Sequence, residues 1–325
     1  LLPINDTSAT GTWADSYPYA AISAFALHPQ YIHLETVAGK QYAGLLKGLN
    51  SEKKKLNGLS EVDYEAVMAL KWRYLKALYE AQKDRWQTDE AYLQYFRENK
   101  HWLEPYAAFC YLRDKYQTSE FTTWKTHSRY DIKNVAKLLS PNAKSYDAVA
   151  IHLFVQWHLH LQLKAAVDYA HQLKLVVKGD IPIGIYRHSC DAWTQPELYN
   201  MDAQAGAPPD DFAVNGQNWG FPTYNWQQMQ ADGFAWWKQR FKQMSLYFDA
   251  FRIDHILGFF RIWSIPMDAV EGILGRFVPC LPVHIDEFAQ KGIWFDYHRY
   301  CQPFINEHLV NQWFGEKANW VKETF

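Results

Sequence analysis

The sequence predicts an α/β protein whose parallel strands belong to a barrel or to a doubly wound sheet. Helical patterns dominate residues 51–171, and two apolar runs of strand length follow, each ending in an acidic residue. The order of helix, buried strand and polar loop occurs at 146–180 and again at 228–254. This repetition is typical of βαβ units. With 325 residues, the chain can form one large domain or two smaller ones.

Charge and composition exclude some classes of partner. The formal net charge of −2 gives no electrostatic basis for binding nucleic acid or an anionic membrane, and no apolar run is long enough to span a bilayer. Aromatic residues make up 17% of the chain. We expect most of them in the core, but so many Trp and Tyr also suit a protein that stacks on sugar rings.

The cysteines predict a reducing compartment. Cys110, Cys190, Cys280 and Cys301 are widely spaced and form no CxxC pair. Reduced thiols in a cytoplasmic protein are therefore the expected state.

The first third of the chain divides into two segments. Residues 1–50 are expected to hold a first barrel strand at 1–7, followed by a polar substrate loop through "DSYPYAAISAF". Residues 51–145 are expected to form a helical insertion.

Within this insertion, Ser60 and Asp63 have the spacing of a capping box, and apolar residues follow them at helical intervals. Further helices are predicted around 89–99 and 105–116.

The third segment, 146–266, is predicted to contribute two barrel strands and an aromatic loop. It opens with a run at 146–171 that is apolar nearly all round, which indicates a helix buried on several sides. The histidines of this run, His152, His158, His160 and His171, match no zinc motif. We expect them to be core or surface residues, and we predict no metal site.

Of the two strands predicted in this segment, the earlier one is the apolar run at 173–178, with Asp180 at its polar end. A long loop follows, "NMDAQAGAPPDDFAVNGQNWGFPTYNW", rich in aromatic and amide side chains that include Gln217, Asn218 and Trp219. Loops after parallel strands often carry binding sites. Packing of the loop on its own side chains is an equal alternative.

The second predicted strand, 248–254, carries the chemistry of most interest. Strand alternation puts Arg252 and Asp254 on one face, with Asp254 at the carboxyl end. A guanidinium this close stabilises the anionic carboxylate. The pair could therefore be a structural ion pair or a catalytic nucleophile with its partner, and the strand alone leaves both open.

Four blocks taken together resemble the signature of the 4-α-glucanotransferases, the amylomaltases or disproportionating enzymes of glycoside hydrolase family 77. They are "DSYPYAAISAFALHP", "KGDIPIGI", "GAPPDDFAVNGQNWGFPTYNW" and "FDAFRIDHILGFFRIW", and they span residues 1 to about 266. The spellings "SYPY" and "RIDHILGFFRIW" resemble the maltose-accepting branch of plant cytosol and some bacteria.

The resemblance implies a TIM (β/α)₈ barrel of the α-amylase type with helical insertions. It also implies retaining transglycosylation on maltose, maltooligosaccharides and larger α-glucans, without cofactor or metal. Carried over by position, Asp254 matches the nucleophile and Arg252 the arginine that keeps it ionised. The substrate-binding positions are Tyr19, which is expected to stack under the −1 glucose, and Asp180, His255, Gln217, Asn218 and Trp219.

The family's acid/base Glu has no match after Asp254. Retaining chemistry needs two carboxyl groups about 5 Å apart. Glu287 heads an expected helix and is not assigned. We therefore expect a fragment covering roughly the first half of the catalytic domain, with 267–325 as a truncated helical extension, inactive by itself. A non-catalytic glucan-binding module and an α-glucan hydrolase remain the alternatives.

Overall fold

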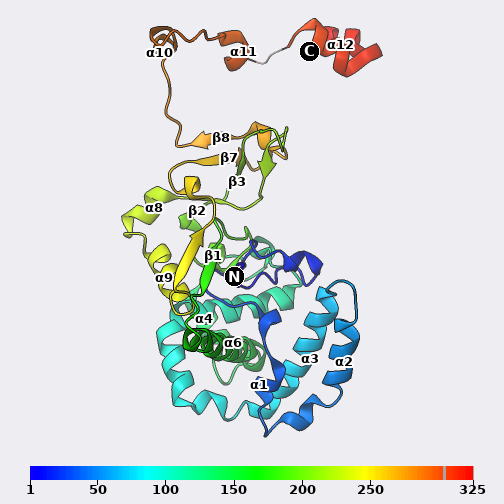
Figure 1. Cartoon of the computed structure of the whole chain (residues 1–325), viewed down its shortest axis with the longest axis vertical. Coiled ribbons are helices and arrows are strands. Elements are labelled where there is room, and N and C mark those ends of the chain that lie inside the picture. The colour runs from blue at the N-terminus through cyan, green and yellow to red at the C-terminus, as the bar shows by residue number, and fades with distance from the viewer. Residues whose placement is uncertain (303–304, 325) are drawn as a thin grey trace. The chain divides into compact units, whose positions relative to one another are not determined.

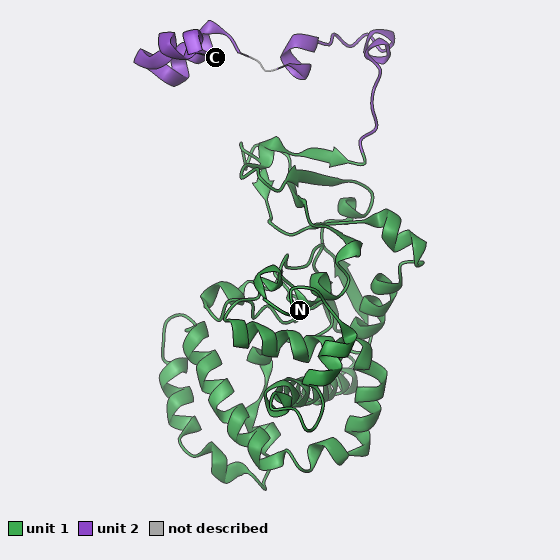
Figure 2. Cartoon of the chain, turned by 180° about the vertical axis from the view of Figure 1, so that it is seen from behind, with its two compact units in different colours: residues 1–279 green, residues 280–325 purple. Residues whose placement is uncertain are grey.

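A computed structural model describes residues 1–302 and 305–324. The chain divides into two compact units, Leu1–Pro279 and Cys280–Phe325 (Figure 2). The boundary at 279 differs from the predicted one at 266, because strand β8, Arg276–Val278, pairs with β7, Ile262–Pro266, and so belongs to the first unit. The predicted helical extension therefore begins with a strand.

The first unit is built on long helices, drawn from blue to green in Figure 1. Its helices are α1 (Leu34–Ala38), α2 (Leu49–Asn57), α3 (Tyr64–Gln82), α4 (Glu90–Tyr116), α5 (Ile132–Leu138), α6 (Tyr146–Gln172), α7 (Cys190–Thr194), α8 (Trp226–Ala231) and α9 (Ala235–Met244). The helical insertion predicted at 51–145 corresponds to α2–α5, and the buried helix predicted at 146–171 is α6.

Two details of the helical region differ from expectation. Helix α3 is capped by Asp63, whose side chain accepts the Ala66 N–H at 2.9 Å, so Ser60 lies outside the cap. The helices predicted at 89–99 and 105–116 are one continuous helix, α4, that contains Pro105. Leu103, Tyr106 and Phe109 are fully buried around that proline, so core packing holds the helix together where its local sequence would interrupt it.

A pair of parallel strands provides the barrel-like part of the fold. Strand β1 (Lys178–Ile181) pairs with β6 (Ala250–Ile253), and α9 lies between them in the sequence, which completes a βαβ unit. The strand predicted at 173–178 lies further along the chain than expected. Helix α6 extends to Gln172, and Leu175 and Val176 after it are exposed, so the apolar run is a connection rather than a strand.

The predicted aromatic loop contains several short strands. Strands β2 (Tyr199–Asn200) and β5 (Thr223–Tyr224) pair with each other. Strands β3 (Ala203–Ala207) and β4 (Gln217–Asn218) join β7 and β8 in an antiparallel sheet of order β4-β3-β7-β8. These short strands satisfy backbone hydrogen bonds both within the loop and with β7.

The first seven residues do not form the predicted regular strand. Asn5 makes a single bridge to Leu27, and the terminal amino group donates to the Lys178 carbonyl at 2.7 Å. This segment therefore runs beside β1 while Leu1 and Leu2 remain exposed.

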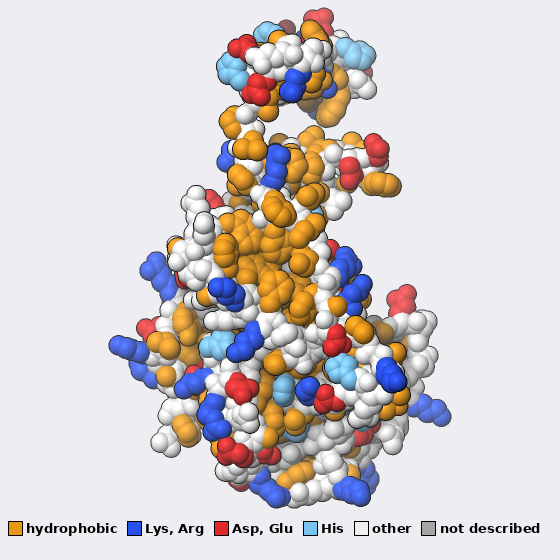
Figure 3. Space-filling model, turned by 60° about the vertical axis from the view of Figure 1, so that its left-hand side comes forward, with side chains coloured by type: hydrophobic (Ala, Val, Ile, Leu, Met, Phe, Trp, Pro, Cys, Tyr) orange, Lys and Arg blue, Asp and Glu red, His pale blue; other side chains and the backbone are white. Residues whose placement is uncertain are grey.

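The core of the first unit lies between the helices and the parallel strands, and it is dense in aromatic side chains such as Trp124, Tyr106 and Phe154. One side of this unit also carries a broad apolar surface (Figure 3). Near the end of β6, the exposed apolar residues are Ile256, Leu257 and Phe260.

The second unit holds helices α10 (Ile285–Gln290), α11 (Tyr297–Cys301), α12 (Glu307–Phe314) and α13 (Ala318–Thr324). Among the described residues, none of the helices combines the length and apolar character needed to cross a membrane.

Candidate active site at the ends of the parallel strands

An arginine joins two carboxylates at the carboxyl ends of β1 and β6. The strand register places Asp180 directly opposite Arg252, and Asp254 follows β6. Arg252 contacts Asp180 Oδ2 through Nη1 at 3.2 Å and donates to Asp254 Oδ1 through Nη2 at 2.9 Å. Arg252 and Asp254 are therefore neighbours, as predicted, although Asp254 lies one residue beyond the end of β6.

The Arg252–Asp254 pair is not a buried structural ion pair. The side chain of Arg252 is 54% exposed and that of Asp254 is 30% exposed. Ion pairs this open to solvent add little to folding stability. The Asp180 carboxylate, followed by the hydrogen bond to Asp254, raises the pKa of Arg252, so the guanidinium remains a fixed positive charge beside both acids.

Asp180 is the buried member of the cluster, and one of its carboxylate oxygens has no hydrogen-bond partner in the described chain. It is 4% exposed, and its Oδ2 accepts the Tyr19 hydroxyl at 3.0 Å as well as Arg252. Its Oδ1 is buried and has no partner within the described part of the chain. Burial and the hydrogen bond to Asp180 raise the pKa of Tyr19, so its hydroxyl stays protonated as a donor.

His255 and Trp219 form a wall beside Asp254. His255 has φ of 50°, a left-handed conformation that is uncommon for residues other than glycine and recurs at functional sites. Its ring lies edge-on to Trp219 with centroids 5.0 Å apart. Burial lowers the pKa of His255, which favours the neutral imidazole near pH 7.

These side chains border one cavity of about 270 Å³. Its lining residues are Tyr17, Tyr19, Pro182, Ile183, Gly184, Trp219, Phe221, Asp254 and His255. Four of the residues singled out from the sequence therefore line one space, and Asp180 and Arg252 join it through their contacts with Tyr19 and Asp254.

Gln217 and Asn218 do not line this cavity. Gln217 Oε1 accepts the Trp219 Nε1–H at 3.0 Å, and Asn218 Oδ1 accepts the Gly220 N–H at 2.9 Å. Both amides therefore support the turn that presents Trp219.

Sequence reasoning missed Tyr17, Ile183, Gly184 and Phe221. Gly184 has a geometric reason for its identity, because a Cβ there would approach Phe221 Cδ2 to 2.2 Å. The "SYPY", "PIGI" and "NWGF" spellings contain these residues, but only the fold shows that the three segments meet.

The acid/base group is not found here. Asp254 is the only carboxylate among the residues that line the cavity within the described chain. Glu287, which was not assigned, accepts the His284 N–H at 3.0 Å in the capping box of α10 in the second unit. The described residues also contain no cluster of three His, Cys, Asp or Glu able to hold a metal ion.

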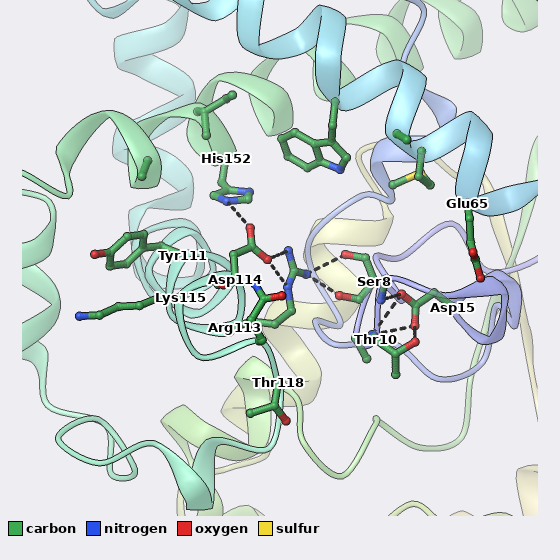
Figure 4. Close-up of a pocket in the computed structure, with 18 of the residues that line it drawn as sticks. Ser8, Thr10, Asp15, Glu65, Tyr111, Arg113, Asp114, Lys115, Thr118 and His152 are labelled. Atoms are coloured by element: carbon green, nitrogen blue, oxygen red, sulfur yellow. Dashed lines mark hydrogen bonds and ion pairs between the residues drawn. The ribbon is translucent and has the colours of Figure 1, made fainter.

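A larger cavity of about 640 Å³ lies elsewhere in the first unit (Figure 4). It is bordered by the loop at 8–15 and by α3, α4 and α6, and His152, Asp114 and Arg113 meet along one side. Despite its size, it shares no lining residue with the strand-end cavity.

Solved structures with similar folds identify the fold class. The amylomaltase from Streptococcus agalactiae in complex with acarbose matches with a TM-score of 0.71 and 25% identity, over 86% of this chain and 56% of that one. The amylomaltase from Corynebacterium glutamicum, at 19% identity and a TM-score of 0.69, supports the fold alone. The class is thus a TIM-barrel protein, present here as an incomplete barrel with a candidate site at its strand ends.

The chain belongs to the 4-alpha-glucanotransferase family, whose profile matches residues 1–313. The 4-alpha-glucanotransferase DPE2 of Oryza sativa subsp. japonica is 43% identical over 99% of this chain and 34% of its own length. The 4-alpha-glucanotransferase of Chlamydia muridarum is 30% identical over 81% of this chain and 48% of its own. The chain thus spans between a third and a half of the length of these relatives.

Proposed function

We propose that this chain carries the nucleophile side of a 4-α-glucanotransferase site. In the proposed reaction, Asp254 attacks the anomeric carbon of a bound α-1,4-glucan, forming a glycosyl ester as the glycosidic bond breaks. The 4-hydroxyl of a second glucan then displaces the ester and regenerates the carboxylate. A second carboxyl group, which the described lining of this cavity does not supply, would protonate the leaving oxygen and later deprotonate the acceptor.

The observation that carries this proposal is the Arg252 guanidinium held between Asp180 and Asp254 beside an aromatic-walled cavity. Arg252 favours the anionic nucleophile and orients its carboxylate, since a guanidinium fork fixes geometry as well as charge. The free Oδ1 of Asp180 is suited to accept a sugar hydroxyl. Tyr19 and Trp219 offer ring faces for the apolar sides of glucose units.

Maltose, maltooligosaccharides and larger α-glucans are the proposed substrates, and cytoplasm the proposed location. The family membership and the acarbose-bound amylomaltase among similar structures support the α-glucan assignment.

α-Maltosyl fluoride tests the nucleophile in this chain alone. Fluoride departs without protonation, so attack by Asp254 requires no acid/base residue. The C–F bond breaks, fluoride leaves, and the anomeric carbon becomes esterified to the carboxylate. We expect intact-mass measurement to show one added maltosyl unit, and peptide mapping to locate it on Asp254.

Asp254→Asn should abolish this adduct. An adduct that persists in Asp254→Asn, or that maps to another residue, would contradict the assignment. Hydrolysis would instead appear as an ester that water removes quickly even when maltose is in excess.

A glucan-binding module is the second candidate, favoured by the single carboxylate that lines the cavity in the described chain. A module would bind maltoheptaose in calorimetry but form no adduct with maltosyl fluoride. Binding together with an adduct would exclude it.

A further inference from the structure

Arg187 is a buried arginine that bonds three backbone carbonyls. It follows β1 in the chain and is 7% exposed. Nη1 donates to the Met201 carbonyl and Nη2 to the Ala203 carbonyl, each at 2.7 Å, and Nε donates to the Gly220 carbonyl at 3.3 Å. Within the described residues, no ion pair to Arg187 is present, although the Asp202 carboxylate partly offsets the effect of burial on its pKa.

Burying a guanidinium without a carboxylate ion-pair partner costs desolvation free energy, so the presence of arginine at position 187 requires an explanation. Burial lowers the pKa of Arg187, which reflects this cost. Its three acceptors come from two stretches of chain, one around 201–203 and one at Gly220. Only a planar fork with donors on several sides can bond all three, and a lysine ammonium cannot reproduce that geometry.

The two stretches that Arg187 joins carry the aromatic wall of the strand-end cavity. The backbone N–H of Trp219 donates to the Ala205 carbonyl at 2.9 Å, and the backbone N–H of Ala205 donates to the Phe221 carbonyl at 2.8 Å. Backbone hydrogen bonds therefore attach segment 219–221 to β3. The Arg187 side chain adds hydrogen bonds to the Ala203 carbonyl in β3 and to the Gly220 carbonyl in the turn.

The wall itself consists of two rings. Trp219 and Phe221 stack with centroids 5.8 Å apart, and both line the cavity that contains Asp254. Gly220, between them, has φ of 76°, so the backbone turns sharply at the residue that Arg187 holds. Two hydrogen bonds fix this turn: Arg187 donates to the Gly220 carbonyl, and the Gly220 N–H donates to Asn218 Oδ1.

We propose that Arg187 is a positioning residue that sets the Trp219–Phe221 wall and thereby governs glucan affinity rather than bond formation at Asp254. This inference rests on the proposed function for its ligand, but its structural part can be tested separately. Arg187 touches neither Asp254 nor Arg252 in the described structure, so its loss should leave the nucleophile cluster unchanged.

The test uses the whole 325-residue chain and maltoheptaose. Calorimetry on Arg187→Met should give binding weaker by about tenfold, because a loosened ring no longer meets the sugar face. Arg187→Lys should fall close to Arg187→Met and serves as a second variant if the methionine variant does not fold. Arg129→Met, which removes an exposed arginine, is the matched control and should bind like the wild type.

A double-mutant cycle separates positioning from general destabilisation. In a Trp219→Ala background, Arg187→Met should weaken binding no further, because the group that it positions is already absent. The adduct-forming rate at saturating α-maltosyl fluoride should stay within about twofold of the wild type in Arg187→Met. Equal losses of affinity in both backgrounds, or a large loss of that rate, would overturn the proposal.

Fluorine NMR gives a readout that does not depend on sugar binding. With 5-fluorotryptophan incorporated, Trp219→Phe identifies the Trp219 resonance by its disappearance. That resonance should shift or broaden in Arg187→Met and remain unchanged in Arg129→Met. If the wild type binds no maltoheptaose, the proposed function fails, and the resonance alone then decides: a changed signal supports the positioning role and an unchanged one refutes it.

Discussion

The two cavities of the first unit differ in how their polar groups are used. In the larger cavity the least exposed charged groups bond neighbouring side chains or the nearby backbone. Asp15 accepts the Thr10 and Gly11 N–H groups at 2.9 and 2.7 Å, and Arg113 donates to the Ser8 hydroxyl at 2.9 Å. Beside the strand-end cavity, Asp180, which bonds the lining residue Tyr19, has a buried oxygen without a partner in the described chain.

The candidate active site therefore differs from the larger cavity in having a buried carboxylate oxygen without a hydrogen-bond partner in the described chain, and its volume is not what distinguishes it. The cavity of about 640 Å³ is more than twice the size of the cavity of about 270 Å³. Yet the fixed cation, the two carboxylates and the left-handed His255 gather only at the smaller one. A buried polar atom left unpaired costs stability unless a ligand satisfies it.

The comparison is tested most strongly by removing one carboxylate from each cavity. Asp254→Asn should reduce the rate of adduct formation with α-maltosyl fluoride by at least about a thousandfold, because an amide is not a nucleophile. Asp114→Asn, at the larger cavity, should leave that rate unchanged. Time-resolved mass spectrometry measures both, and similar losses in the two variants would remove the distinction between the cavities.

Arg252→Met should slow adduct formation by about a hundredfold, since Asp180 and Asp254 would then face each other without their shared cation. Arg252→Lys should recover part of the rate, because an ammonium supplies charge but cannot bridge both acids. An unchanged rate in Arg252→Met would mean that the arginine is structural.

The helical region should control how stability depends on acidity. Burial lowers the pKa of His152, His158 and His160 from 6.5 to about 4. As the pH falls below about 6.5, these histidines become protonated in the unfolded chain but stay neutral in the folded chain. The free energy of unfolding therefore falls until about pH 4. Each histidine contributes a slope of up to about 1.4 kcal/mol per pH unit in this window.

His158→Leu isolates one of these histidines. Its Nε2 is buried without a partner among the described residues, so leucine removes a proton site and no hydrogen bond. In urea titrations at several pH values, the slope of the unfolding free energy against pH should be smaller by the contribution of one proton, up to about 1.4 kcal/mol per pH unit. Between pH 6.5 and 4.5 this difference amounts to roughly thirtyfold in the folding equilibrium. An identical slope in the variant and the wild type would show that His158 titrates normally.

The sequence predicted the features that depend on local periodicity. Helix α6 followed from its apolar run, and the proximity of Arg252 and Asp254 followed from strand alternation. The start of β1 did not, because the apolar residues Leu175 and Val176 look like a strand but lie exposed after the helix.

The sequence also did not predict the contacts that form the walls of the strand-end cavity. Phe221 meets Gly184 and Trp219 meets His255 only after the antiparallel sheet has formed. No periodicity within either segment encodes such contacts between distant segments. The quoted blocks identified the family, but the geometry that joins them is tertiary.

The smallest expected effect is at the margin of the larger cavity. Lys76 lines it from α3 and is exposed, so Lys76→Met removes a charge there without leaving a buried group unpaired. If this cavity takes no part in the proposed reaction, maltoheptaose affinity and the maltosyl-adduct rate should both stay within about twofold of wild type, as for most surface substitutions. Calorimetry and mass spectrometry under the conditions used for Asp254→Asn measure both quantities. A clear loss of affinity with an unchanged adduct rate would show that glucan reaches the larger cavity as well, because Lys76 has no contact with the strand-end residues through which it could act.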